Sequence, residues 1–291
     1  MFNTKFWQLK TLLFIGVVTL SCSALQVSAK TAKALPPVSV QLWSVKDALK
    51  ADFEGTLQSL SDMGFQGVEF AGDFGSYRND PSKLKRKLSD LNLVASSAHI
   101  GFEVLTNESI SDTLLFYKTL GVSLLFVPWD ERAWHPTGVI ALTKQLIAVN
   151  NIAQRYDMQI GFHNHDQEFN HYKGATYWDY IATQTPANMP LQLDIGWVNY
   201  AGKNPLTYVK NYPQRTISTH LKIRTHKNDG LSPIIGENSY SWQSLIKSLI
   251  QHGGTQWLVL EQEEYPHGLT PMQSVAKSKA NLDMILQEMA L

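Results

Sequence analysis

The sequence predicts one α/β domain built as a (β/α)8 barrel. Short apolar runs of strand type alternate with longer segments of helical periodicity along almost the whole chain. No change in composition divides the 291 residues, and this length suits a single α/β barrel. Regular strand-helix alternation implies parallel strands joined by right-handed crossovers, and eight such units can close into a barrel.

The N-terminal half contains four strand-helix units, and several of their helices have clear start and stop signals. Asp52 can cap a helix that ends at Gly64. Asp80 can cap the next helix, which has Pro81 at its first position. Strands and helices are expected in alternation at 38–42, 53–63, 67–70, 81–91, 93–99, 111–120, 123–128 and 139–156.

The C-terminal half continues the same alternation with shorter helices. Pro205 starts one of them and Pro213 ends it. No glycine-rich phosphate loop follows the first strand of the chain, which argues against a dinucleotide-binding fold. The expected elements, again strand first, are 158–163, 177–183, 191–194, 205–212, 216–222, 241–252, 256–261 and 271–289.

The first residues have the pattern of a secretory signal peptide. Lys5 and Lys10 precede a short apolar run at 12–20, and Val27-Ser28-Ala29 supplies small residues for cleavage. The run is too short for a membrane span, which needs about 20 residues. We therefore expect export, to a periplasmic location, with no stable membrane span after processing. The expected organisation is a signal peptide at 1–29, a lead-in at 30–37 and the barrel at 38–291.

Two alternatives concern this leader. It could stay attached as an anchor, or Cys22 could carry a lipid. Thr19, three positions before Cys22, is not the large aliphatic residue of a lipoprotein site, so we expect cleavage after Ala29 instead. Because Cys22 is the only cysteine, cleavage would exclude disulfides and thiolate metal sites. The formal net charge of zero argues against a nucleic-acid partner.

Four expected strands end in residues that commonly bind metals. These are His163, Asp194, His220 and Glu261, each of which follows an apolar run. The C-terminal ends of barrel strands meet at one rim, so these side chains should converge. Any one of them alone could be a helix-capping acid or a buried histidine. Together they would repel each other without a cation, and a donor set without sulfur suits Mn²⁺, Mg²⁺, Co²⁺ or Zn²⁺.

The motifs around these residues resemble the xylose-isomerase-like sugar isomerase/epimerase superfamily of TIM barrels, over residues 38–286. His163-Asn164-His165-Asp166-Gln167-Glu168-Phe169 is similar to its fifth-strand motif Tyr-His-Asn-His-Asp-x-Glu-Phe. The resemblance implies one divalent metal. The matching motifs and the ligands that they imply are Leu193-Asp194-Ile195-Gly196-Trp197, His220-Leu221-Lys222 and Leu260-Glu261-Gln262, with His163, Asp194, His220 and Glu261 as ligands.

The chain departs from the superfamily pattern at two places. Many members have Glu as the fifth-strand ligand, where this chain has His163, so His165 or Glu168 could take that role. The seventh-strand motif often reads His-x-Lys-Asp, but Ile223 follows Lys222 here. The second departure affects the expected substrate contacts more than the metal.

Further residues near the expected rim are candidates for proton transfer and substrate binding. His99, His165, Glu69 and Lys222 could move a proton or stabilise an oxyanion. A rim salt bridge or a supporting hydrogen bond is the alternative role for each. The residues expected to contact substrate are Trp197, Glu168 and Trp43.

The expected function is a metal-dependent sugar isomerase or epimerase that acts through an enediolate on a small carbohydrate. The alternative with the same chemistry is a lyase or dehydratase on a 3-keto-sugar or keto-glycoside. A hydrolase similar to endonuclease barrels would need a basic face that the neutral chain lacks. A sugar-binding barrel without catalysis is a further class. A homo-oligomer is compatible with the sequence.

Overall fold

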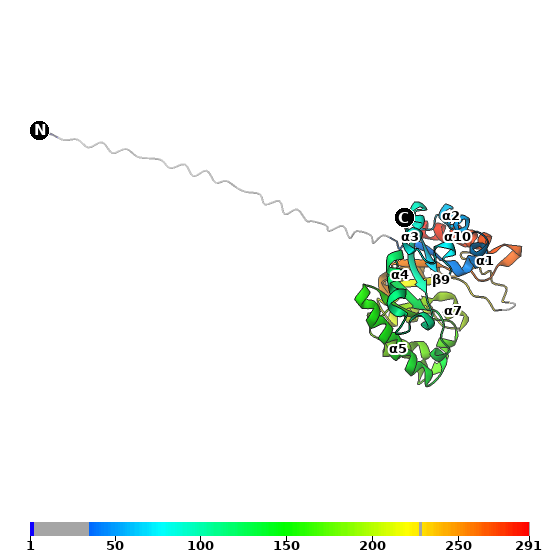
Figure 1. Ribbon diagram of the computed structural model, residues 1–291. Helices are drawn as coiled ribbons and strands as arrows, with labels where there is room; N and C mark the ends of the chain where they lie inside the picture. The colour runs from blue at the N-terminus through cyan, green and yellow to red at the C-terminus, as the bar shows by residue number, and fades with distance from the viewer. Residues whose placement is uncertain (3–34, 227–228, 291) are drawn as a thin grey trace. The chain divides into compact units, whose positions relative to one another are not determined.

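The structure is a computed structural model that describes residues 1–2, 35–226 and 229–290 (Figure 1). Almost all of the expected signal peptide, with Cys22 and the cleavage site, lies outside the described residues, as does most of the lead-in. Export and processing therefore stay predictions. Within the described part of the chain, no helix combines the length and the apolar character needed to cross a membrane.

Eight parallel strands form a closed barrel, which confirms the predicted fold class. The first and last strands close it, because Val40 pairs with Leu260 on one side and with Val68 on the other. All other neighbouring strands also pair in parallel. In barrel order the strands are β1 (Val38–Gln41), β2 (Gly67–Phe70), β3 (Val94–His99), β4 (Leu124–Val127), β5 (Gln159–His163), β8 (Leu191–Asp194), β9 (Ser218–Leu221) and β10 (Trp257–Leu260).

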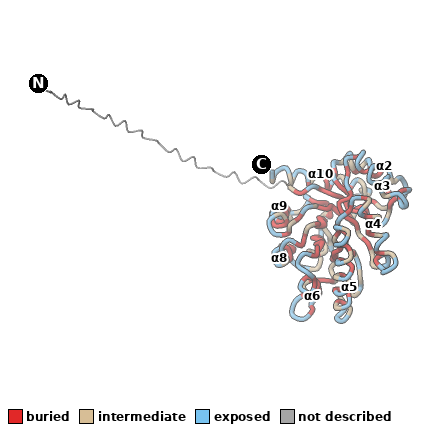
Figure 2. The backbone as a smooth tube through the Cα atoms, turned by 60° about the vertical axis from the view of Figure 1, so that its left-hand side comes forward, coloured by how far each residue is buried: buried red, intermediate tan, exposed pale blue. Residues whose placement is uncertain are grey.

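Helices surround the barrel and bury one face against it. Figure 2 shows buried residues along the central strands and exposed residues on the outer helices. In α5, for example, Leu142, Leu146 and Val149 are buried and follow helical spacing. The helices are α1 (Lys46–Ala51), α2 (Phe53–Asp62), α3 (Pro81–Asp90), α4 (Ile110–Leu120), α5 (Gly138–Ala153), α6 (Tyr177–Gln184), α7 (Ile195–Tyr200), α8 (Pro205–Asn211), α9 (Trp242–Ser248) and α10 (Pro271–Ala290).

The predicted helix caps are confirmed. Asp52 Oδ1 accepts the backbone N–H of Gly55 at 2.9 Å at the start of α2. Asp80 Oδ1 accepts the N–H of Lys83 at 2.8 Å, and Pro81 is the first residue of α3. These caps satisfy N–H groups that have no partner within the helix.

The structure differs from the predicted elements at several places. Two short helices, α1 and α7, were not predicted, and neither was the hairpin of β6 (His171–Tyr172) and β7 (Ala175–Thr176). The helix expected at 241–252 is divided into α9 and a π-helical turn at Leu249–Gly253. Elements of two to six residues are too short to produce a hydrophobic period, which explains why pattern alone missed them.

Candidate active site

Three of the predicted metal ligands meet at the C-terminal ends of neighbouring strands. Asp194 ends β8, His220 lies in β9, and Glu261 directly follows β10. One ligand atom from each lies within 4.8 Å of the other two, and all three side chains are buried. His220 Nδ1 is 2.9 Å from Glu261 Oε2 and 3.6 Å from Asp194 Oδ2. These residues could therefore hold one cation between them.

The two carboxylate oxygens of Asp194 have different roles, one in capping a helix and one facing the site. Oδ1 accepts the N–H of Trp197 at 2.9 Å and caps α7. Among the described residues, Oδ2 is buried and accepts no hydrogen bond, although Lys222 Nζ lies 2.9 Å away. A buried carboxylate oxygen that lacks a hydrogen bond is costly unless a cation binds it. Lys222 supplies a positive charge at Asp194 Oδ2, and because this oxygen accepts no hydrogen bond it is also free to coordinate a metal ion placed among Asp194, His220 and Glu261.

His163 is placed beside this group at the end of β5. Its Nε2 atom lies 3.8 Å from Asp194 Oδ2, and its ring centroid is 4.6 Å from that of His220. Of the three fifth-strand alternatives, His163 is the one within 4 Å of an expected ligand atom among the described contacts. The ring of His165 lies farther out, 5.3 Å from the ring of His163 and 4.8 Å from that of Trp129.

Glu168 is fully buried and holds the segment that follows β5. Its Oε2 atom accepts the backbone N–H of His165 at 2.9 Å, and Oε1 has no hydrogen-bond partner in the described part of the chain. Burial raises the pKa of Glu168 to about 8. Glu168 does not line the cavity of the site, so its position supports a structural role more than the predicted substrate contact.

Glu69 occupies the centre of a buried hydrogen-bond network below the metal ligands. Its carboxylate accepts hydrogen bonds from Gln41 Nε2 at 2.7 Å and Ser97 Oγ at 2.5 Å. His220 Nε2 lies 2.5 Å and His99 Nε2 lies 3.2 Å from Glu69 Oε1. Burial alone would raise the pKa of Glu69, but the charges of His99 and His220, together with hydrogen bonds from His220 and Ser97, outweigh it and lower the pKa to about 2.

His220 is oriented by this carboxylate. Because Nε2 donates to Glu69, Nδ1 is the nitrogen that faces Asp194 and Glu261. Burial opposes protonation, but Glu69 and Glu261 raise the pKa of His220 well above its ordinary value. A carboxylate behind a metal-binding histidine is the usual device for fixing the ring, so Nδ1 would be the metal-binding nitrogen once a metal ion replaces the proton that it shares with Glu261.

Gln192, which the sequence reading missed, determines the orientation of two histidines. Its Nε2 donates to Glu69 Oε2 at 2.6 Å and to Ser218 Oγ at 2.9 Å, so its Oε1 is the acceptor. That oxygen lies 2.7 Å from His99 Nε2 and 3.0 Å from His163 Nδ1. This network assigns the proton of His163 to Nδ1 and leaves an electron pair on Nε2. Gln192 precedes Asp194 by two residues and so shares its strand face, which was a readable signal.

Lys222 brings a positive charge to the same rim. Its Nζ atom lies 2.6 Å from Glu261 Oε2 and 2.7 Å from Glu263 Oε2. Burial would lower the pKa of Lys222, but Asp194, Glu261 and Glu263 outweigh this effect and raise it. Lys222 therefore stays charged. The sequence reading also missed Glu263, although it follows Glu261 by two residues.

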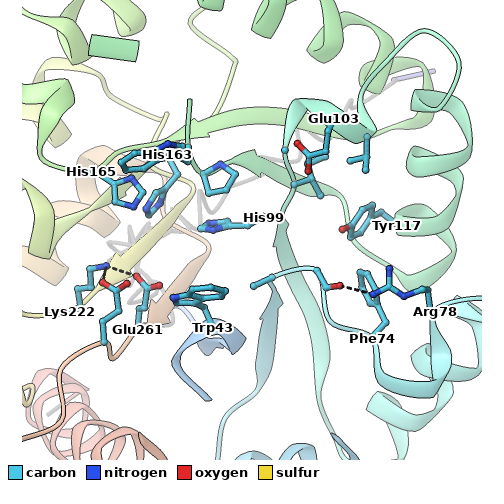
Figure 3. A pocket seen from close by; sticks show the side chains of 18 residues that line it. Trp43, Phe74, Arg78, His99, Glu103, Tyr117, His163, His165, Lys222 and Glu261 are labelled. Carbon is cyan, nitrogen blue, oxygen red and sulfur yellow. Dashed lines mark hydrogen bonds and ion pairs between the residues drawn. The ribbon is translucent and has the colours of Figure 1, made fainter. Parts of the chain in front are cut away.

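A cavity of about 690 Å³ opens above these residues at the rim of the barrel (Figure 3). Of the residues predicted to bind substrate, Trp43 lines it and is 48% exposed. Trp197 is not among the lining residues. Its ring lies 5.1 Å from Lys222 Nζ and 4.6 Å from Arg224 Cζ. The predicted catalytic and metal-binding residues that line the cavity are His99, His163, His165, Lys222 and Glu261.

Comparison with known proteins identifies the family. The family model of the xylose isomerase-like TIM barrel matches residues 57–287. The chain belongs to the xylose isomerase-like TIM barrel family. The match covers most of the barrel and all four predicted metal ligands.

The proteins similar to this chain include both isomerases and dehydratases. An inosose dehydratase from Clostridium botulinum (strain Eklund 17B / Type B) is 23% identical over 271 residues, covering 78% of this chain and 87% of the relative. A sugar phosphate isomerase/epimerase from Parabacteroides distasonis ATCC 8503 has a TM-score of 0.69 and 23% identity, covering 87% of this chain and 95% of that structure. An L-ribulose 3-epimerase has a TM-score of 0.61 and 13% identity, with coverage of 88% and 96%. These similar structures support the shared fold.

Proposed function

We propose that the protein is a sugar isomerase or epimerase that depends on one divalent metal. The observation that carries the proposal is the buried donor group of Asp194, His220 and Glu261, in which Asp194 Oδ2 accepts no hydrogen bond from the described residues. His163 Nε2 supplies a fourth donor. A divalent ion bound there would polarise the carbonyl and the adjacent hydroxyl of a keto-sugar and so acidify the carbon between them.

His99 is the base that we assign to proton removal. Its Nε2 atom donates to Gln192, so the electron pair is on Nδ1. Burial and the charge of His220 lower the pKa of His99, although Glu69 opposes this shift, so the ring is neutral near pH 7. A neutral imidazole beside the cavity can accept the proton of the activated carbon. Glu69 acts through His99 and His220 and is therefore a positioning residue.

His165 is the candidate for the second proton transfer. It lines the cavity, and its Nδ1 atom is buried without a hydrogen-bond partner among the described residues. Burial, together with the nearby charge of Lys222, lowers the pKa of His165 to about 4. With a pKa of about 4, His165 is neutral near pH 7, so it would relay a proton from solvent to the opposite face of the carbon and thereby invert that carbon in an epimerase. The Lys222 ammonium would stabilise the negative charge of the enediolate oxygen.

A lyase or dehydratase is the second candidate function, and the inosose dehydratase relatives favour it. The first step is the same, with His99 as base. The protonated His99 would then pass the proton that it took from carbon to a leaving oxygen on the neighbouring carbon, whose bond to carbon breaks, instead of a proton returning to the carbanion. The two functions differ in the fate of the enediolate and not in how it forms.

Deuterium exchange tests both candidates. The metal-loaded protein is incubated with free keto-sugars and keto-glycosides in D₂O, and NMR follows the carbon next to the carbonyl. Incorporation of deuterium with the carbon skeleton and substituents retained supports an isomerase or epimerase. Exchange with loss of water or of a glycosidic group supports a lyase. Absence of exchange with every sugar would contradict the proposal and favour a binding barrel.

A further inference from the structure

The cavity extends well beyond the metal ligands. In Figure 3, His99, His163, His165, Lys222 and Glu261 group at one end, and Phe74, Arg78, Glu103 and Tyr117 group at the other. A volume of about 690 Å³ is several times that of one sugar ring. Cavities of about 300 to 1,000 Å³ hold ligands of drug size. We call the second group of four residues the distal end of the cavity.

Polar groups without partners gather at the distal end. The side chain of Tyr117 is 6% exposed, and its hydroxyl points into the cavity without a hydrogen bond to any described residue. Arg78 and Glu103 form no ion pair with the described chain, and the Arg78 guanidinium has one weak contact, 3.5 Å from Gly72 O. Arg78 and Glu103 are exposed, whereas Tyr117 is buried, so the Tyr117 hydroxyl is the group for which a ligand would supply the missing partner.

The surrounding surface limits the chemistry of that ligand. Phe74 is buried and stacks on Phe70, so it presents an apolar wall. Arg78 and Glu103 both lie near Tyr117 (Figure 3), and the charge of Arg78 lowers the pKa of Tyr117 while that of Glu103 raises it, although burial produces the larger rise. A donor and an acceptor of opposite charge match the hydroxyls of a neutral sugar ring, whereas Glu103 would repel a phosphate.

We propose that the distal end is a subsite for a second sugar ring, so that the substrate is an unphosphorylated disaccharide or glycoside. The first ring lies over the metal ligands. The second ring packs on Phe74 and exchanges hydrogen bonds with Tyr117, Arg78 and Glu103. This inference rests on the proposed function for the orientation of the first ring, and it specifies the substrate class.

Binding measurements test the subsite on the metal-loaded full chain. The probes are cellobiose, maltose, lactose and trehalose, each compared with glucose and with glucose 6-phosphate by calorimetry and saturation-transfer NMR. At least one disaccharide should bind about tenfold more tightly than glucose, because its second ring adds hydrogen bonds and apolar contact at the distal end. Saturation should reach both rings.

Variants test whether the tighter binding of a disaccharide than of glucose depends on residues of the distal end. Tyr117→Phe and Arg78→Ala should lose most of the disaccharide advantage and leave glucose binding and thermal stability unchanged. Tyr156→Phe and Arg86→Ala are matched controls, because neither residue lines the cavity, and both should keep the advantage. Equal binding of all disaccharides and glucose, tighter binding of glucose 6-phosphate, or variants that retain the advantage would each overturn the inference.

The outcome is separable from that of the proposed function. Deuterium exchange on free keto-sugars without any disaccharide advantage would leave the function standing and remove the subsite. A disaccharide advantage without exchange on any sugar would keep the subsite and contradict the enzymatic proposal.

Discussion

At the scale of single residues, the site depends on how the protein orients the nitrogen and oxygen atoms that face one another at the rim. Gln192 holds the Nδ1 proton of His163 and so leaves Nε2 facing Asp194 Oδ2. Glu69 does the same for His220 through Nε2 and leaves Nδ1 facing the carboxylates. These supporting contacts set the direction of the ligand atoms before any metal binds.

Glu69→Gln tests this positioning. The substitution keeps the shape of the side chain but removes the charge that orients His99 and His220, so metal affinity should fall about 10- to 100-fold. Competition with a chelating dye measures the affinity. Glu131→Gln, at an exposed position, is the control and should bind metal as the unchanged protein does. An unaltered affinity in Glu69→Gln would remove the positioning role.

Glu168 predicts a specific dependence of stability on pH. Burial raises its pKa from 4.5 to about 8, so between these values the folded protein keeps a proton that the unfolded chain releases. The free energy of unfolding therefore falls as pH rises through that window. Glu168→Gln cannot titrate, so its stability relative to the unchanged protein should rise from about pH 5 to about pH 8, by at most about 4 kcal/mol.

Urea unfolding at several pH values measures this difference. Glu131→Gln should show a constant difference over the same range. A Glu168→Gln curve that runs parallel to that of the unchanged protein would show that Glu168 is ionised when folded.

The predicted site residues that lie together at the rim share one property. Asp194, His220, Glu261 and Lys222 stand at strand ends, where the barrel brings them together. Tyr117 belongs to α4 and Arg78 follows a 3-10 turn, so no strand period relates them to the cavity. Their convergence depends on loop conformation, which local pattern does not specify.

At the scale of elements, β5 carries His163, the expected ligand that departs from the Glu of many family members, and β5 packs closely against β8. A methyl group at Gly161 would lie 2.1 Å from Pro190 O, which belongs to the backbone before β8. If a side chain at Gly161 pushed β5 away from Pro190, His163 at the end of the same strand would move with it. Glycine is therefore required here for close approach of two backbones.

Gly161→Ala should lower the free energy of unfolding by at least about 2 kcal/mol and weaken metal binding. Gly67→Ala is the matched control on β2. There the nearest atom to an added methyl is 3.0 Å away, in the ring of Trp257, which can adjust. Denaturation and dye competition compare the two, and similar effects at both positions would contradict the argument about β5.

The elements that the sequence missed show where functional and structural roles overlap. Asp194 ends β8 and also caps α7, so the residue that supplies a ligand begins a helix only six residues long. Capping signals at Asp52 and Asp80 were readable because longer amphipathic helices follow them. Where no amphipathic helical pattern follows, as after Asp194, the sequence does not distinguish a capping residue from a loop residue.

At the scale of the whole molecule, the expected metal would join four strands. His163, Asp194, His220 and Glu261 come from or follow β5, β8, β9 and β10, which are consecutive neighbours in the barrel. The fold class was predictable because the strand-helix alternation runs through the entire barrel. Which side chains face each other across the interior depends on strand register. The shared strand face of Gln192 and Asp194 was therefore readable from the sequence, but the contacts of Gln192 with residues of other strands were not.

Metal binding should therefore stabilise the entire barrel. Metal at about 100 times its dissociation constant should add about 2.7 kcal/mol, enough to raise the melting temperature by several degrees. Asp194→Asn should lose this response to added metal. Calorimetry with and without a chelator measures it, and equal melting temperatures for the metal-loaded and chelated protein would argue against a shared site.

The most direct test of the central claim is the metal content of the purified protein. Elemental analysis of protein expressed with metal supplied should find about one divalent ion per chain. Asp194→Asn and Glu261→Gln should each fall close to zero while keeping the fold by circular dichroism. A folded wild-type protein without stoichiometric metal, or variants that retain it in full, would contradict the claim.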